Sequence, residues 1–148
     1  MNTTTDENDI FFGDIPPEIN ALLQQGIAVH VSDPQLAESH FREALARRPD
    51  ILCSYRCLVK HYNRRLQFDN AITTVRAWLA EAVRQAGSPA DWREWQDASS
   101  AMLGALKAFA FVELRRGREE EAQAAIARLQ QLDPEDGTGV SVLAALAH

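Results

Sequence analysis

The residues best suited to metal chemistry lie near the middle of the chain, where Cys53, Cys57 and His61 recur at intervals of four residues. That spacing places all three on one line of an α-helix. Two thiols and an imidazole arranged in this way can share a metal ion such as zinc. Three ligands on one helix drift around its axis, however, and no fourth ligand is evident. Two interpretations therefore stay open: a metal or redox site, or three side chains that pack in or near the core.

A second pattern on the same stretch could bind carboxylates. Arg56, Lys60 and Arg64 follow one another at four-residue steps, and Asn63 adds a neutral hydrogen-bond donor and acceptor. Like charges at this spacing repel each other by roughly 0.2–0.5 kcal/mol per pair, so helix formation gives no reason for the pattern. A carboxylate-bearing ligand would neutralise it. The pattern indicates either an acidic peptide ligand or an ordinary solvated basic face.

No arrangement typical of catalysis stands out in the sequence. We find no Ser-His-Asp order, glycine-rich phosphate loop or paired-carboxylate constellation. The acidic run from Glu119 to Glu121 is typical of the first turn of a helix. We therefore predict a protein that is not an enzyme and that needs no cofactor.

The charge is unevenly distributed along the chain. The formal net charge is -6, and no lysine or arginine precedes Arg42. Between Arg42 and Arg84, by contrast, nine basic residues face four acidic ones. An acidic tail beside a basic middle favours an acidic partner. The overall acidity and the lack of interleaved aromatic residues argue against nucleic acid as a ligand.

The composition favours an all-α protein. Alanine, leucine, arginine, glutamate and glutamine dominate, and runs of β-branched residues are scarce. Two cysteines are too few for a disulfide framework. No signal peptide and no apolar run long enough to cross a bilayer is visible, so we expect a cytoplasmic protein without membrane partners.

Capping residues and breakers set the expected helix boundaries. Ser32 or Asp33 should cap the second helix and Asp69 the fourth. The breaker at residues 87–89 should start the next helix, which restarts at the serines of residues 99–100. These signals predict a disordered acidic tail over residues 1–14 and a domain over 15–148, with helix pairs at about 17–48, 51–86 and 89–133 and a short final helix at about 140–147 that covers the open end.

Three segments share one skeleton of small and large apolar residues. Residues 37–49 and 122–134 each begin with alanine, carry a large apolar residue four positions later and end in proline. Residues 71–83 share the first two features, and an insertion from residue 87 to about 102 precedes the third copy. The matching residues are Ala37, Ala71 and Ala122 (small), Phe41, Val75 and Ile126 (large), Pro49 and Pro134 (closing), Gly26 and Ala110 (small, first helix) and Gly117 (turn).

On these residues the chain resembles the tetratricopeptide repeat (TPR) family over roughly residues 17–134. The resemblance implies a right-handed superhelix of three helical hairpins plus a short C-terminal capping helix. It also implies a protein-protein interaction module, adaptor or chaperone-like, that binds an acidic or carboxylate-bearing peptide in a basic concave groove. The family's carboxylate clamp uses Lys, Arg and Asn, which only the second and third pairs match. The implied peptide-binding residues are Arg56, Lys60, Asn63, Arg64, Lys107, Phe111, Ile27 and His30.

The layout is also similar to that of small TPR proteins associated with nitrogen-fixation gene sets. That similarity implies an alternative function, a metal- or redox-linked accessory protein that uses Cys53, Cys57 and His61. Such a protein would support the maturation of a nitrogenase-type metalloenzyme.

Two apolar features fall outside the repeats. Ile10, Phe11 and Phe12 sit in the acidic tail, where they either cap the first helix pair or visit a groove of this or another copy. Trp92 and Trp95, in the insertion, either pack back onto the helices or contact a partner. The tail and the insertion are therefore two candidate routes to a homo-oligomer.

Overall fold

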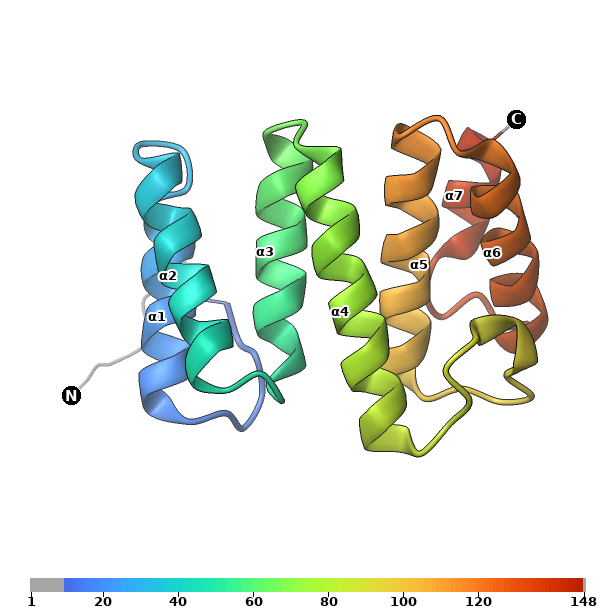
Figure 1. Ribbon diagram of the computed structural model, residues 1–148, viewed down its shortest axis with the longest axis horizontal. Helices are drawn as coiled ribbons and strands as arrows, with labels where there is room; N and C mark the ends of the chain where they lie inside the picture. Colours follow the sequence, from blue (N-terminus) through green and yellow to red (C-terminus); the bar gives the residue numbers. More distant parts are fainter. Residues whose placement is uncertain (1–9, 148) are drawn as a thin grey trace. The chain divides into compact units, whose positions relative to one another are not determined.

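A computed structural model describes residues 10–147, and every regular element in that range is helical (Figure 1). These residues form seven α-helices and one 3-10 turn, with consecutive helices packed as pairs. The all-α prediction is confirmed. The chain divides into two compact units, one up to Cys57 and one from Leu58 onward. Of the predicted acidic tail, residues 1–9 lie outside the described range.

The first unit is built on the hairpin of α1 (Pro17–Val29) and α2 (Pro34–Arg47). Asp33 caps α2 as predicted, because its carboxylate accepts the Leu36 amide at 3.2 Å and Pro34 occupies the first turn. The two helices cross where Gly26 meets the buried ring of Phe41. A small residue at the crossing lets the helices approach closely, and Gly26 is one of the small residues of the repeat skeleton.

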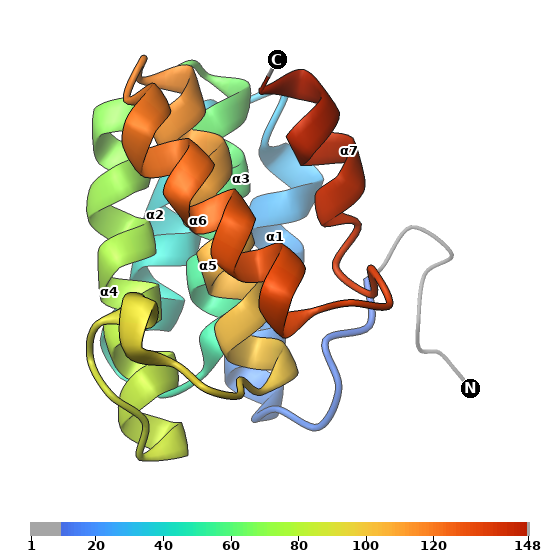
Figure 2. The same cartoon turned by 90° about the vertical axis from the view of Figure 1, so that its right-hand side faces the viewer.

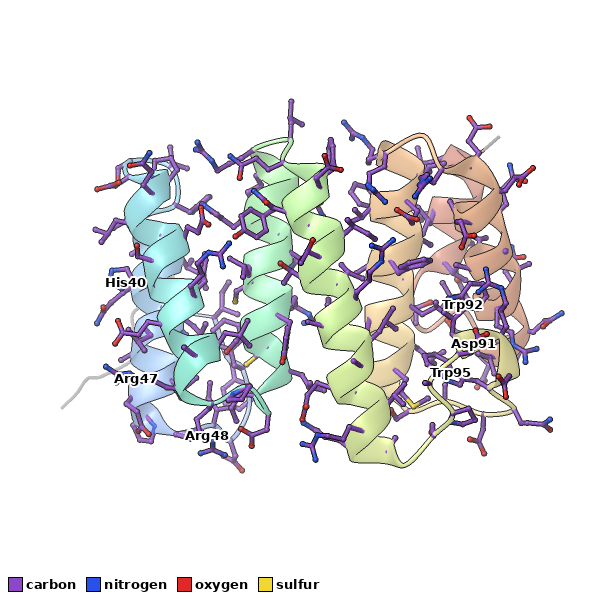
Figure 3. All side chains as sticks on the ribbon, viewed as in Figure 1. His40, Arg47, Arg48, Asp91, Trp92 and Trp95 are labelled. Atoms are coloured by element: carbon purple, nitrogen blue, oxygen red, sulfur yellow. The ribbon has the colours of Figure 1, made fainter. Side chains whose placement is uncertain are left out.

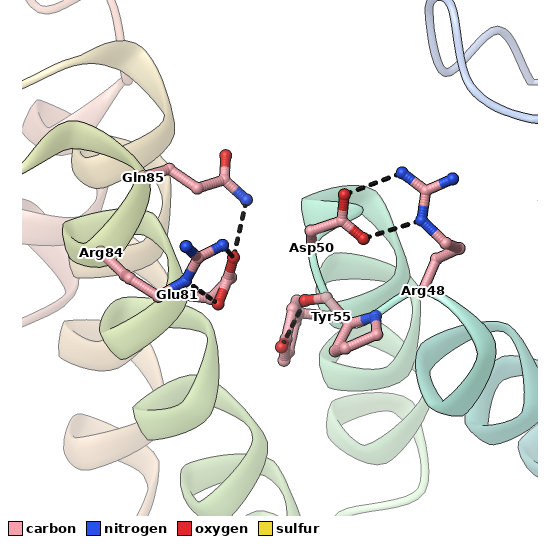
Figure 4. A network of polar contacts seen from close by, with 7 residues as sticks. Arg48, Asp50, Tyr55, Glu81, Arg84 and Gln85 are labelled. Carbon is pink, nitrogen blue, oxygen red and sulfur yellow. Dashed lines mark hydrogen bonds and ion pairs between the residues drawn. The ribbon is translucent and has the colours of Figure 1, made fainter.

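Polar contacts hold the segment that joins α2 to α3 (Leu52–Arg64) (Figure 4). Arg48 donates two hydrogen bonds to Asp50, at 2.9 and 2.8 Å. The Tyr55 hydroxyl donates to the Pro49 carbonyl at 2.8 Å. The boundary between the two units falls inside α3, which continues as one helix to Arg64.

In the second unit a short turn leads from α3 into α4 (Phe68–Ala86). Asp69 does not cap α4, contrary to the sequence-based prediction. Gln67 occupies the cap position, but its side chain accepts no backbone amide of the first turn. Asp69 lies in that first turn and accepts a hydrogen bond from Arg116 at 3.2 Å. The helix begins earlier because the backbone amide of Gln67 is already bonded to the Tyr62 carbonyl at the end of α3.

The insertion folds as a compact loop and not as the helix expected from residue 89. It contains a 3-10 turn (η1, Trp92–Glu94), and α5 (Ser100–Arg115) begins only where Ser99 caps it, so the predicted restart at the serines is the true start. Trp92 and Trp95 are both buried, and Figure 3 shows them close together beside Asp91. The indole N–H of Trp95 donates to the Pro89 carbonyl, six residues back, at 2.8 Å, and this bond closes the loop.

The remaining helices pack against their neighbours in chain order. α5 packs against α4 and against α6 (Glu119–Leu132), and α6 packs against α7 (Val140–Leu146) (Figure 2). Gly117, at φ +80°, ends α5 as predicted. None of the helices in the described part of the chain has the length and apolar character needed to cross a lipid bilayer.

Two carboxylates organise the loop between α6 and α7. Asp133 accepts hydrogen bonds from the amides of Gly137 and Thr138 and from the Thr138 hydroxyl, at 2.9, 2.9 and 2.6 Å. Asp136 accepts from the amide and the hydroxyl of Ser141. The hydrogen bonds from Thr138 and from Ser141, respectively, lower the pKa of each carboxyl below its usual value. The ionised carboxylates therefore stabilise the folded loop.

This loop predicts a dependence of stability on pH. A carboxyl whose pKa is lowered by folding stabilises the protein above its unfolded pKa, about 3.9, and loses that contribution as the pH falls through the folded value. We expect Asp133→Asn to unfold at lower urea concentration than the wild type at neutral pH, and the gap to narrow below about pH 4. Urea unfolding of both proteins, followed by circular dichroism at several pH values, measures this difference in stability. A gap that stays constant in strong acid would contradict the assignment.

Candidate functional site

The solvent-facing edge of α3 is a narrow cationic strip. Most of the helix is covered, and the buried side chains include Tyr55, Leu58, Val59 and Tyr62. From Ser54 to Arg64 the exposed positions are the three predicted cations, and Asn63 is half-buried beside them. We call Arg56, Lys60, Asn63 and Arg64 the α3 strip.

In the part of the chain that the structure describes, the cations of the α3 strip have no carboxylate partner, a property that they share with five other arginines. Six arginines outside the strip pair with a carboxylate, as Arg84 does with Glu81 in Figure 4. Among residues 10–147, no ion pair includes a cation of the strip. Local ion pairs therefore leave the charge of the strip unneutralised.

Asn63 adds an acceptor to the strip. Its side-chain oxygen is buried and has no hydrogen-bond partner among the described residues. A buried acceptor without a donor is costly, and native structures usually satisfy such atoms. Because this oxygen is shielded from solvent, a bound peptide could reach it only after the Asn63 side chain rotates outward.

The candidate metal ligands are mostly inside the protein. Cys57 and His61 are buried and Cys53 is half-buried. Burial raises the pKa of the Cys53 thiol and so disfavours the thiolate that binds metals and reacts with oxidants. Within the described range, no three His, Cys, Asp or Glu side chains are grouped to hold a metal ion. These positions thus favour the packing interpretation.

The other predicted contact residues lie in both units. Ile27 lies in α1 and His30 is its C-cap residue. Both are half-buried, and the His30 ring nitrogen Nδ1 lies 2.8 Å from the Ile27 carbonyl. Lys107 and Phe111 belong to α5 and are also half-buried. The Lys107 ammonium donates to the Thr138 carbonyl at 2.5 Å, so this cation anchors the loop before α7.

The structure also contains a cleft that sequence reasoning missed. The turn after α3 and the turn after α5 together enclose about 500 Å³, open to solvent. We call this the turn cleft; its lining residues are Leu66, Phe68, Asp69, Arg116 and Arg118. The two turns, residues 65–67 and 116–118, are 51 residues apart in sequence, so only the packing of α4 on α5 brings them together. The sequence signal was a leucine, Leu66, at a helix end where glycine is usual.

Arginines dominate the polar side of the turn cleft. Arg116 is held between Asp69, at 3.2 Å, and the buried carboxylate of Glu113. The Arg115 guanidinium lies over the Phe68 ring, 4.9 Å from its centroid, a cation–π contact. Arg118 is exposed and belongs to no ion pair among residues 10–147. The cleft therefore offers apolar walls beside a cation that is free for a ligand.

Comparison with protein-family models, with curated proteins and with solved structures found no match for the chain. The TPR resemblance therefore stays a prediction that rests on the repeat skeleton of residues 37–134. Inference about function has to start from the side chains of this chain.

Proposed function

We propose that this protein is a peptide-binding module that captures an acidic segment of a partner protein along the α3 strip. The observation that carries the proposal is the exposed row of Arg56, Lys60 and Arg64 without ion-pair partners in the described residues. A folded protein gains nothing from three adjacent like charges. A ligand with carboxylates makes the row favourable.

The spacing of the row suggests the form of the ligand. Residues four apart on a helix rise by about 6 Å along its axis. In an extended peptide, side chains two residues apart project on the same side about 6.6 Å from one another. An extended peptide with an acidic residue at every second position thus matches the cations closely in pitch.

We further propose that the consecutive helix pairs form a TPR-like superhelix and that the module works as a cytoplasmic adaptor or chaperone-like protein. The support is the repeat skeleton together with the close approach of Gly26 and Phe41 at the first crossing. In this proposal Phe111 and Lys107 supply flanking contacts to the peptide.

The proposal predicts a specific loss of binding. A labelled peptide with three glutamates at alternating positions should bind more tightly than a peptide of the same composition with the glutamates in a block. We expect Arg56→Glu with Lys60→Glu to weaken the first peptide at least about tenfold, because each lost charged hydrogen bond is worth roughly 1.5–3 kcal/mol. Fluorescence anisotropy measures both affinities.

The matched control is Arg76→Glu paired with Arg42→Glu. Arg76 and Arg42 are exposed cations on α4 and α2, so this pair changes the net charge equally without touching the strip. Circular dichroism verifies that both double variants fold. If the strip variant binds the alternating peptide as well as the wild type does, the proposal is wrong.

A further inference from the structure

Leu66 has an unusual conformation for a leucine. The helices α3, α4 and α5 end in the same motif. One residue adopts the left-handed conformation, and the backbone N–H of the next residue donates to the carbonyl five residues before it. The donor–acceptor distances are 2.9, 3.2 and 2.8 Å, respectively. Gly87 and Gly117 occupy the left-handed position in α4 and α5, and Leu66, at φ +59°, occupies it in α3. A side chain at that backbone geometry is strained, whereas glycine is not.

Burial does not compensate Leu66 for this strain. Its side chain is 67% exposed, so the leucine gains little from the core of its own chain. Leu66 forms a wall of the turn cleft, beside Phe68 and Arg118. Backbone strain is concentrated at ligand-contact positions, so Leu66 marks the turn cleft as a candidate contact site.

The turn cleft calls for a ligand that is apolar and acidic together. Arg64, Arg65, Arg115, Arg116 and Arg118 lie in or next to its two turns. Two carboxylates there, Asp69 and Glu113, both pair with Arg116. Glu119 and Glu120 lie at the start of α6. Because Arg116 is paired, Arg118 is the exposed cation that lines the cleft beside its apolar walls.

The chain carries such a ligand near its own N-terminus. Residues 6–14 contain four acidic residues, no basic residue and the apolar run Ile10 to Phe12. Phe11 is 88% exposed. The Gln24 side chain accepts from the Ile10 amide at 3.2 Å and donates to the Ile10 carbonyl, which holds this segment on α1 of its own copy. The cleft of another copy can take Phe11 without breaking those bonds.

We propose that the turn cleft binds residues 6–14 of a second copy of this chain, with Phe11 against Leu66 and Phe68 and the flanking carboxylates at Arg118. The contact joins copies through two different surfaces, so it builds either a closed ring, of which the reciprocal dimer is the smallest, or an open chain. This inference does not depend on the α3 strip, because none of the strip residues lines the cleft.

Sedimentation velocity of the full-length protein over a wide concentration range tests the contact. We expect the average mass to rise with concentration, and Phe11→Ser or Arg118→Glu alone to shift association to at least tenfold higher concentration. An equimolar mixture of these two variants should pair again, because one keeps an intact cleft and the other an intact segment. Lys60→Glu should leave association unchanged.

The opposite results overturn the proposal. The proposal is wrong if the wild type stays monomeric at every concentration. It is also wrong if neither Phe11→Ser nor Arg118→Glu changes association, or if the mixture of the two variants does not associate. If Lys60→Glu weakened association and Arg118→Glu did not, residues 6–14 would bind the α3 strip. That result would contradict binding at the turn cleft but would support the proposed function.

Leu66→Asn separates the binding role of this residue from its structural role. Asparagine tolerates the left-handed conformation better than leucine does, so the variant should unfold at a higher urea concentration than the wild type. It should nevertheless weaken association, because the apolar wall is lost. Association as strong as that of the wild type would overturn the role given to Leu66, whatever the change in stability.

Discussion

Trp95→Ala should lower the free energy of unfolding by about 3–5 kcal/mol, the range typical of a buried tryptophan or phenylalanine truncated to alanine. The Trp95 side chain is 1% exposed, and its indole N–H donates to the Pro89 carbonyl at 2.8 Å. The substitution empties a large volume in the core of the second unit and removes the bond that closes the loop. Urea unfolding followed by circular dichroism measures the loss.

Two neighbouring substitutions control for this result. Trp95→Phe keeps most of the apolar volume but loses the indole donor, so we expect a smaller loss than for alanine. Gln96→Ala, at an exposed position next to it, should change stability by less than about 0.5 kcal/mol. If Trp95→Ala costs no more than Gln96→Ala, the loop is not packed on the helices as described.

Gly26→Ala should destabilise the first unit by about 2–3 kcal/mol, as overpacking of a tight core does. A Cβ at residue 26 would lie 2.5 Å from Cε1 of Phe41, closer than real Cβ atoms approach a neighbour. The sign is diagnostic, because helix propensity alone favours alanine over glycine in mid-helix by about 1 kcal/mol. Chemical denaturation of the full-length variant measures the change.

A matched glycine and a compensating substitution sharpen this test. Gly104 lies inside α5 with its nearest neighbour, Cζ2 of Trp78, 4.0 Å from the added Cβ, so Gly104→Ala should be neutral or stabilising. Phe41→Leu should recover part of the stability lost in Gly26→Ala, which a double-mutant cycle detects as a coupling between the two sites. Equal effects of alanine at residues 26 and 104 would contradict a close helix crossing at Gly26.

Local chemistry determined most of the helices. Asp33 and Pro34 start α2 and Gly117 ends α5 as predicted, because capping and the left-handed turn act over only a few residues. The pairing of Gly26 with Phe41 could also be anticipated, since it belongs to a repeated pattern of small and large residues. Of the candidate site, the sequence predicted the α3 strip through the four-residue spacing of its cations.

Tertiary packing decided the features that depend on residues far apart in the chain. No helix starts at residue 89, and Trp92 and Trp95 are instead buried in a loop that the bond from Trp95 to the Pro89 carbonyl closes. The role of Lys107 as an anchor for the loop before α7 requires α5 to meet a segment 31 residues later. The turn cleft exists only because α4 packs on α5 and brings together two turns that no local pattern connects. Short-range hydrogen bonds can be inferred from neighbouring residue types, whereas a cleft between distant turns depends on how whole helices pack.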